Sequence, residues 1–322
     1  MRPSLLLSSL TLVACGTSSP VAVEAVDLSE LPYADTDPRA RLEPELLAVP
    51  PEPELSGRYE ELPVRDGVAL FHDVLTGETR ELATMTELRE WSASGNLGVA
   101  RQELRTNVSN TAAYPARAVV KLYSTYPNGQ TFSCSGSFIG TRFVLTAAHC
   151  IFNSGRGGWA STVRVIPGLS GSYKPYGTAY SNGLISVTGY TQEGNKSSDY
   201  AMIYLDRELG STVGWFGIQA ASDGQLDGAA LAMNGYPAES YDGVTQVAVS
   251  GSEDDESDDM IYYTLESEGG FSGSGVRRAA NNLYVTGINT RSNCYAFPIT
   301  FSRACGVRLN GGRVSRIIGW MQ

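Results

Sequence analysis

The chain has 322 residues, of which 42% are hydrophobic and 18% are charged, and it holds 5 cysteines but only 2 histidines. This composition excludes a highly charged disordered chain, and beyond the N-terminus no apolar run approaches the roughly 18 residues that a membrane-spanning helix needs. The net charge of −10 disfavours nucleic acid as a partner, and the scarcity of histidine disfavours a His-rich metal site.

Residues 1–15 have the pattern of an export signal. A positive start at Met1-Arg2 precedes a short apolar stretch over residues 5–14, which is typical of a secretion signal rather than of a spanning helix. The sequence Leu12-Val13-Ala14-Cys15-Gly16 resembles the bacterial lipoprotein signal, in which the cysteine becomes the lipidated first residue. We therefore expect export from a bacterial cell, with a lipid on Cys15 as the one membrane contact. The alternative is an ordinary signal peptide with a chance cysteine.

Residues 16–100 have the composition of an acidic, proline-rich linker and propeptide. The first hundred residues hold 7 of the 24 basic residues and 17 of the 34 acids, which leaves 17 of each for residues 101–322. The run Val-Pro-Pro-Glu-Pro-Glu at 49–54 should be extended rather than packed. We expect this region to be poorly structured and to be cut from the rest within residues 95–105. An acidic spacer that follows a lipid anchor is the alternative to a propeptide.

Two short elements are nevertheless predicted inside this region. Apolar residues over 68–74, followed by Thr76-Gly77, indicate a β-hairpin. Thr84 and Glu87 stand at the spacing of a capping box, which predicts a short helix over residues 84–91.

From about residue 105 onward the sequence consists of short β-like runs separated by Gly and Asn. This pattern predicts an all-β, antiparallel barrel or sandwich, and the lack of alternating amphipathic helices disfavours a doubly wound fold. Helical spacing of Val314, Ile317, Ile318 and Met321 predicts one helix at the C-terminus. The expected strands are residues 118–123, 143–146, 163–166, 201–205, 246–249, 261–265 and 283–288.

Residues 251–259 form a strongly acidic run, with 6 acids in the sequence Gly-Ser-Glu-Asp-Asp-Glu-Ser-Asp-Asp. Such a run is most often a solvated loop. Calcium binding by its oxygen ligands is an alternative, although the run lacks EF-hand spacing.

Three segments carry residue types suited to nucleophilic catalysis. They are Leu-Thr-Ala-Ala-His-Cys at 145–150, Ser-Asp-Tyr-Ala at 198–201, and Gly-Gly-Phe-Ser-Gly-Ser-Gly at 269–275. A serine hydroxyl is a weak nucleophile that needs a base within hydrogen-bond reach, and the base needs an acid that orients it. Histidine suits the role of base because its usual pKa lies near neutrality. Glycines beside the serine allow backbone N–H groups to turn toward a developing oxyanion.

These segments resemble the trypsin- and chymotrypsin-like serine proteases, and within them the bacterial glutamyl-endopeptidase branch. Further matches are Asn234-Gly235-Tyr236-Pro237 and the run Arg-Thr-Asn-Val-Ser-Asn-Thr at 105–111, which is similar to the start of mature enzymes in that branch. The resemblance covers about residues 105–322, and we expect the protease domain over residues 101–322. It implies two antiparallel six-stranded β-barrels with a C-terminal helix, and an activity toward protein or peptide substrates.

The resemblance also implies the role of each site residue. His149 would be the general base, Asp199 its orienting acid and Ser272 the nucleophile that forms an acyl-enzyme. The backbone N–H groups of Gly270 and Ser272 would form the oxyanion hole, and Ser274 is the competing nucleophile. No cofactor and no metal are expected, and we expect a monomer.

Four cysteines remain after Cys15. An even number in an exported chain suggests two disulfides, and spacing alone permits three pairings; zinc ligation is the rival, but no CxxC spacing is present. The resemblance implies a bridge between Cys134 and Cys150 behind the catalytic histidine, which leaves Cys294 and Cys305 to close a loop of the second barrel.

The sequence departs from animal trypsins at Phe271, because an acid at this position normally pairs with the new N-terminus after activation. Zymogen control must therefore work differently here. Glutamate-specific relatives use a pocket histidine, and the comparable strand here carries Asn289, Thr290 and Arg291.

The preferred substrate side chain stays open at this point. Counting back from Ser272 places Glu266 and Ser267 at the base of the specificity pocket. Glu266 would favour basic substrate side chains, whereas Arg291 would favour acidic ones. A catalytically inactive binding protein with the same fold is the alternative function. An α/β-hydrolase is disfavoured because its triad order would be Ser, acid, His.

Overall fold

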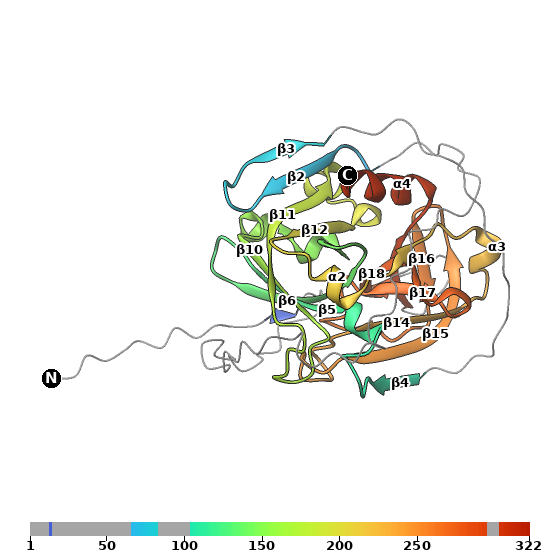
Figure 1. The fold of residues 1–322 in the computed structure, drawn as a ribbon. Coiled ribbons are helices and arrows are strands. Elements are labelled where there is room, and N and C mark those ends of the chain that lie inside the picture. Colours follow the sequence, from blue (N-terminus) through green and yellow to red (C-terminus); the bar gives the residue numbers. More distant parts are fainter. Residues whose placement is uncertain (1–12, 15–65, 83–103, 295–302) are drawn as a thin grey trace.

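The computed structural model describes residues 13–14, 66–82, 104–294 and 303–322. The region predicted to be the protease, residues 101–322, folds as two β-barrels (Figure 1). The first barrel is built from residues drawn in green to yellow and the second from residues drawn in orange to red. Both barrels are closed, antiparallel and six-stranded, so the predicted fold class is confirmed.

The first barrel has the strand order β10-β5-β6-β7-β12-β11 and is closed by pairing between β10 and β11. Its sheet is extended at β11 by the hairpin of β2 (Ala69–Asp73) and β3 (Thr79–Glu81), and β1 (Val13–Ala14) pairs in parallel with β6. The six barrel strands are β5 (Val119–Thr125), β6 (Thr131–Phe138), β7 (Phe143–Thr146), β10 (Thr162–Pro167), β11 (Ala179–Val187) and β12 (Ala201–Leu205).

The second barrel has the order β18-β17-β14-β15-β16-β19 and is closed by pairing between β18 and β19. Two short strands lie outside the closed ring, β13 (Gly217–Ile218) on β18 and β4 (Leu104–Asn107) on β15. The six barrel strands are β14 (Ala230–Gly235), β15 (Val247–Glu256), β16 (Met260–Tyr263), β17 (Gly275–Arg278), β18 (Tyr284–Cys294) and β19 (Arg303–Arg308).

Buried apolar side chains form the core of each barrel. Strand β12 illustrates the reason, since four of its five residues are buried and Ile203 has an exposed fraction of 0%. Burying a side chain of this size contributes about 1.5–3 kcal/mol relative to leaving it in water. Phe138 and Leu184 of the first barrel and Val276 of the second are buried to the same degree.

The remaining elements are short, apart from the last helix. Helix α4 (Gly311–Trp320) begins three residues before the predicted Val314, because the side chain of Asn310 accepts a hydrogen bond from the Arg313 N–H and caps it. No helix among the described residues is long and apolar enough to cross a membrane. The short elements are α1 (Thr188–Thr191), α2 (Gly210–Val213), α3 (Asp223–Leu226), β8 (Phe152–Asn153), β9 (Gly158–Trp159) and the 3-10 turns η3 (Ala116–Ala118), η4 (Ala148–Cys150), η5 (Ser154–Arg156), η6 (Lys196–Ser198) and η7 (Ala279–Asn281).

All seven predicted strands are present, and residues 143–146 and 201–205 have the predicted bounds. The hairpin predicted near residues 68–74 is present as β2 and β3. The helix predicted over residues 84–91 lies outside the described residues, as do Cys15 and most of the export signal.

The prediction that residues 251–259 form a solvated loop is wrong for most of that run. Strand β15 continues to Glu256, and Glu253 is 3% exposed and accepts a hydrogen bond from the Gly228 N–H. Asp254 pairs with Arg303, and Asp259 pairs with Arg313 at 3.0 Å. The acids make the run look like a loop, although residues 251–256 form a strand and Glu253, Asp254 and Asp259 have partners within the protein.

Candidate active site

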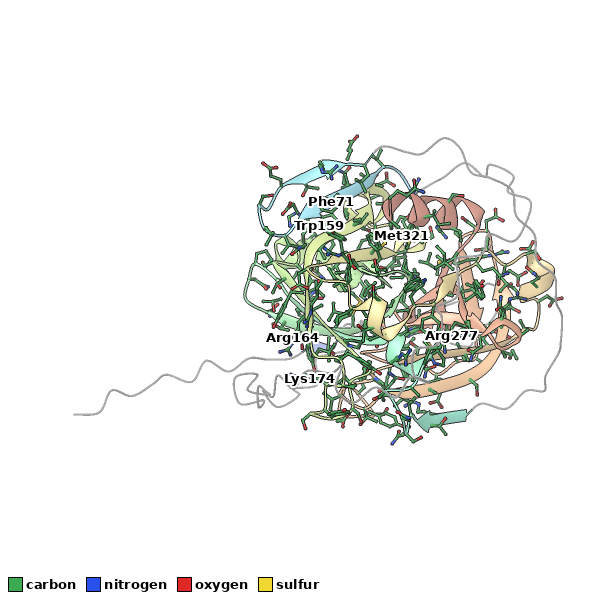
Figure 2. All side chains as sticks on the ribbon, viewed as in Figure 1. Phe71, Trp159, Arg164, Lys174, Arg277 and Met321 are labelled. Atoms are coloured by element: carbon green, nitrogen blue, oxygen red, sulfur yellow. A yellow bond between two sulfur atoms is a disulfide. The ribbon has the colours of Figure 1, made fainter. Side chains whose placement is uncertain are left out.

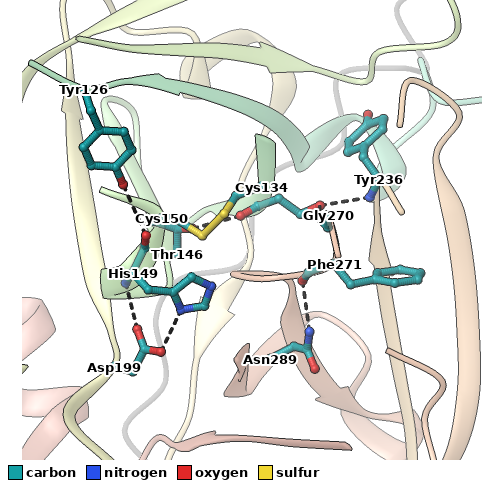
Figure 3. Close-up of a disulfide and its surroundings, with 11 residues drawn as sticks. Tyr126, Cys134, Thr146, His149, Cys150, Asp199, Tyr236, Gly270, Phe271 and Asn289 are labelled. Atoms are coloured by element: carbon teal, nitrogen blue, oxygen red, sulfur yellow. Dashed lines mark hydrogen bonds and ion pairs between the residues drawn. A yellow bond between two sulfur atoms is a disulfide. The ribbon is translucent and has the colours of Figure 1, made fainter. Parts of the chain in front are cut away.

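His149 and Asp199 form a two-point contact at the edge of the first barrel (Figure 3). The His149 backbone N–H donates to Asp199 Oδ1 at 2.9 Å, and the ring Nδ1 lies 2.7 Å from Asp199 Oδ2. Both side chains are shielded, with exposed fractions of 12% and 6%. The pairing of β7 with β12 brings them together, because His149 follows the first strand and Asp199 precedes the second.

This geometry determines what the imidazole can do. A carboxylate accepts hydrogen bonds, so this contact favours the tautomer with the proton on Nδ1. In the neutral imidazole of that tautomer, Nε2 carries a lone pair. Fixing the ring by a carboxylate leaves Nε2 suited to accept a proton from an alcohol and to return it later. Tyr126 also contacts this turn, since its hydroxyl donates to the His149 carbonyl at 3.2 Å.

The turn that carries Ser272 is held against the first barrel by Ser135. The Ser135 N–H donates to the Ser272 carbonyl and its hydroxyl donates to the Gly270 carbonyl, both at 2.8 Å. Gly273 has a φ of +85°, and a Cβ there would collide with Thr146 Oγ1 and with the Ser135 carbonyl. Only glycine fits this position, and the turn therefore packs directly onto the segment that leads into His149.

The backbone amides of this turn fall into two groups. The first group has partners within the protein: the Gly269 N–H donates to Glu239 Oε1. The N–H groups of residues 271, 273 and 274 donate to the carbonyls of residues 268, 289 and 271, respectively. The N–H groups of Gly270 and Ser272 donate no hydrogen bond within the described part of the chain. These are the two donors expected for an oxyanion hole, and such unpaired donors can bind a developing negative charge.

Ser274, the competing nucleophile, has an exposed fraction of 0%, and a Cβ at Gly235 would collide with its hydroxyl oxygen. Ser272 is 4% exposed. The complete burial of Ser274 favours a structural role in the turn.

Both disulfides implied by the resemblance are present, Cys134 to Cys150 and Cys294 to Cys305. The first links β6 to the turn that carries His149 (Figure 3). Within the described residues, Cys134, His149 and Cys150 are the one group close enough to hold a metal ion. Because both sulfurs are bonded to each other, they offer no thiolate, and the group does not fit a metal site.

The five residues predicted to bind substrate have different surroundings. Asn289 is fully buried; its amide donates to Ser267 Oγ and to the Phe271 carbonyl, and it accepts from the Tyr263 hydroxyl at 2.7 Å. Its hydrogen-bonding capacity is therefore largely used within the protein. The Thr290 hydroxyl donates to the Cys305 carbonyl at 3.3 Å.

The two charged residues of this group differ in their partners. Glu266 Oε2 lies 2.7 Å from Arg105 Nε in an ion pair, and its side chain is 54% exposed. Arg291 Nε is buried and has no hydrogen-bond partner among the described residues.

Sequence reasoning missed Ser135, although it holds the Ser272 turn through two hydrogen bonds. The residue lies in the run Ser-Cys-Ser-Gly-Ser at 133–137, which reads as an ordinary polar strand. Its role depends on contacts with residues 135 or more positions away, and no local pattern reveals them.

Comparison with known proteins relates the chain to proteases. The family model described as Trypsin matches residues 106–298. The chain is 35% identical over 190 residues to a protein named "Glutamyl endopeptidase" from Bacillus licheniformis, covering 59% of this chain and 55% of the relative. It is 33% identical over 190 residues to a protein named "Extracellular metalloprotease" from Bacillus subtilis, covering 59% and 60%. The chain thus matches little more than half the length of these curated relatives.

The solved structure titled "Structure of Glu endopeptidase in complex with MPD" matches with 27% identity and a TM-score of 0.59, covering 66% of this chain and 94% of that one. The protease Anisep from Arthrobacter nicotinovorans matches with 21% identity and a TM-score of 0.54, covering 66% and 100%, a likeness that concerns the fold alone.

Proposed function

Because the chain belongs to the trypsin family of serine proteases, near its glutamyl-endopeptidase branch, we propose that it is an exported endopeptidase made as a precursor. Its triad is His149, Asp199 and Ser272. The observation that carries this proposal is the two-point contact of His149 with Asp199, with Nδ1 to Oδ2 at 2.7 Å. It lies beside a turn in which two N–H groups have no partner among the described residues.

The reaction follows from these groups. His149 Nε2 takes the proton of the Ser272 hydroxyl while Oγ attacks the scissile carbonyl carbon. The resulting oxyanion accepts hydrogen bonds from the N–H groups of Gly270 and Ser272, each of which contributes on the order of 10²–10³-fold to the rate. His149 then protonates the leaving amine, an acyl-enzyme remains on Ser272, and water activated by His149 hydrolyses it.

The nucleophile is tested by labelling with a fluorophosphonate probe, followed by peptide mapping. We expect the label on Ser272, loss of labelling in Ser272→Ala, and retained labelling in the matched variant Ser274→Ala. Labelling that survives Ser272→Ala would assign the nucleophile elsewhere, and a folded wild-type chain without any labelling would point to the inactive binding protein.

For the substrate side chain, we propose a preference for acidic residues before the scissile bond. One oxygen of the Glu266 carboxylate already pairs with Arg105, which weakens Glu266 as a partner for a basic substrate side chain. Arg291 offers a buried guanidinium nitrogen without a partner among the described residues, and a guanidinium binds a carboxylate well. A relative at 35% identity is named for glutamyl specificity.

This preference is tested with three peptides that differ only in Glu, Gln or Lys before the scissile bond. We expect kcat/KM for Glu to exceed that for Lys at least tenfold, and Arg291→Gln to reduce the difference between Glu and Gln. A higher kcat/KM for Lys would show that Glu266 sets the preference instead.

Export is supported by the predicted signal, by the two disulfides and by a relative named "Extracellular". The proposed lipid on Cys15 is tested by metabolic labelling with a fatty acid in a bacterial host. Label in the wild type and none in Cys15→Ala is expected; no label in either would indicate an ordinary signal peptide.

A further inference from the structure

Asp66 is a buried carboxylate that lies within the region predicted to be a propeptide. Its side chain is 4% exposed and accepts hydrogen bonds from Ser198 Oγ at 2.8 Å and from the Tyr200 hydroxyl at 3.1 Å. Ser198 and Tyr200 are the residues on either side of Asp199. Asp66 therefore holds both neighbours of the acid that orients His149.

The charge of Asp66 is balanced by Arg313 of helix α4. Arg313 Nε and Nη2 both donate to the Asp66 carboxylate at 2.9 Å, and the Arg313 side chain is 1% exposed. Asp259 also contacts Nη2, at 3.0 Å, but its side chain is 26% exposed and it does not reach Nε. Removing one partner of a buried, hydrogen-bonded ion pair strongly destabilises a protein, because the other charge stays buried without its partner.

Arg313 also connects the two barrels at this point. Its Nη1 donates to the carbonyls of Asp259 and Arg308 next to the second barrel, while Nη2 donates to the carbonyl of Ser197 in the first. The ion pair with Asp66 thus lies where the hairpin, both barrels and the C-terminal helix meet, as the neighbouring positions of β2 and α4 in Figure 1 indicate.

The chain after Asp66 is bound to the first barrel as an ordinary strand. Strand β2 pairs with β11 from Ala69↔Val187 to Asp73↔Gly183. The Gly189 N–H donates to the Asp66 carbonyl at 2.9 Å, and the Thr188 N–H donates to the Val68 carbonyl at 2.8 Å.

Side chains of the hairpin also fit the barrel. The ring of His72 stacks on Trp159 with 5.4 Å between the ring centroids. A Cβ at Gly183 would collide with the ring of Phe71, and Figure 2 shows Phe71 and Trp159 in the same upper part of the first barrel. With these contacts, residues 66–82 pack as part of the first barrel rather than as a segment that separates easily from it.

We propose that residues 66–82 are a permanent part of the active protease and that Asp66 is a positioning residue for Asp199. A cut at 95–105 would then leave this segment bound without a covalent link to the catalytic chain. The two hydroxyls of Ser198 and Tyr200, anchored on the Asp66 carboxylate, fix the backbone that carries Asp199 and so direct its carboxylate at His149. This inference rests on the proposed function only in its catalytic half.

The first test follows the fate of the segment. The full chain is produced in an exporting bacterial host, isolated under native conditions, labelled with a fluorophosphonate and then denatured for mass spectrometry. We expect residues 66–82 in a 1:1 ratio to the labelled protease, either in one chain or as a bound fragment. Labelled, active protease that lacks them would overturn the inference.

The second test separates positioning from folding. In Asp66→Asn we expect the acylation rate per titrated active site to fall at least tenfold while KM changes less than about twofold. The matched control Glu78→Gln, an exposed acid of the same hairpin, should match the wild type in both quantities. A lower fraction of titratable sites with an unchanged rate per site would mean that Asp66 only stabilises the fold.

A third variant covers the case in which Asp66→Asn does not fold. The double substitution Ser198→Ala and Tyr200→Phe removes the two hydroxyls but keeps the buried ion pair intact. We expect a several-fold lower acylation rate per site, and an unchanged rate would overturn the positioning role. Retention of residues 66–82 is measured by mass even if the wild type takes no label, so failure of the proposed function is distinguishable from failure of this inference.

Discussion

A single carboxylate, that of Asp199, receives two hydrogen bonds from one residue, His149. One bond comes from the backbone N–H of His149 and the other from its ring, so the position of the residue and the orientation of its imidazole are fixed together. An amide in place of the carboxylate would keep the shape, but its oxygen would accept from the His149 backbone N–H and its NH₂ group would face Nδ1. A donor at that position favours the wrong tautomer.

We therefore expect Asp199→Asn to lower kcat by roughly 10³–10⁴-fold while the protein stays folded. Steady-state kinetics on a peptide substrate, with circular dichroism as the check on folding, measures this. The exposed acid Glu193 offers the control, because Glu193→Gln should leave kcat unchanged; a loss in kcat below tenfold for Asp199→Asn would contradict the assigned role.

Lys121 is a basic residue whose side chain is buried in the first barrel, with an exposed fraction of 1%. Its ammonium lies 5.3 Å from the Tyr123 ring and 5.9 Å from the Tyr236 ring, and it has no hydrogen-bond partner among the described residues. Burial lowers the pKa of Lys121 to about 7, only partly opposed by the charge of Asp242.

This shift predicts how stability changes with pH. Between pH 7 and the unfolded pKa of roughly 10.4, the unfolded chain binds more protons at Lys121 than the folded chain does, so stability rises as the pH increases through this range. We expect Lys121→Met to flatten that rise and to increase the free energy of unfolding at pH 6 by at least about 1 kcal/mol. Urea unfolding from pH 6 to 10 measures both; a variant less stable at pH 6 would contradict the prediction.

At the scale of elements, the Ser272 turn depends on Gly273 for two separate reasons. Its φ of +85° is unfavourable for other residues, and a Cβ would collide with Thr146 Oγ1 and the Ser135 carbonyl. Gly129 has a similar φ of +82° with open space around it. Substituting alanine at Gly129 and at Gly273 therefore separates the destabilisation caused by the positive φ from that caused by the steric collision.

We expect Gly129→Ala to lower the free energy of unfolding by about 1–2 kcal/mol and to retain fluorophosphonate labelling. Gly273→Ala should cost more than that and abolish labelling, because the turn must move away from the His149 segment. Equal effects of the two substitutions on stability and labelling would show that the close approach at Gly273 is unimportant.

Elements with a purely local pattern could be predicted from sequence. Residues 143–146 and 201–205 have the predicted bounds because they are short, mostly apolar runs that are largely buried in the barrel. The acidic half of β15 could not be recognised, since the partners of Asp254 and Glu253 are Arg303 and the Gly228 N–H, which lie far away in the sequence. Helix α4 was predicted too short because Gly311 and Gly312 conceal its first turn, which Asn310 caps.

The predicted site shows the same division. The resemblance supplied His149, Asp199 and Ser272, but Asp66 could not be found because its partner Arg313 lies 247 residues away. The acidic, proline-rich composition of the surrounding sequence also misleads, because an acid in such a region is expected to be exposed to solvent. Long-range pairs of this kind appear only when the chain is folded.

At the scale of the whole molecule, the Asp66–Arg313 pair lies where the two barrels meet, and we expect it to make the stability of this junction depend on acid pH. Burial alone would raise the pKa of the Asp66 carboxyl, but the hydrogen bonds and positive charge of Arg313 outweigh it and leave the pKa below its usual value. A lowered folded-state pKa contributes stability that is fully present above the unfolded value of roughly 3.9 and is lost as the pH falls through the folded value.

We therefore expect the wild-type melting temperature to fall steeply below about pH 4, with early loss of hydrogen-exchange protection in residues 69–73. Asp66→Asn should start from a lower melting temperature at pH 7 and show a shallower fall between pH 4 and 2. Parallel curves for the two proteins would show that other carboxyls govern acid unfolding.

The hairpin has one more consequence, which concerns the surface of the sheet. Strand β3 ends the first sheet with three exposed residues, Thr79, Arg80 and Glu81, and charged side chains on an outermost strand discourage pairing between molecules. Without the hairpin, the last strand at this end would be β11, whose residues 183–187 include the apolar Leu184, Ile185 and Val187. A protease without residues 66–82 would expose unpaired backbone groups along residues 183–187 of β11, so we expect it to aggregate in addition to losing the contacts that Asp66 makes beside Asp199.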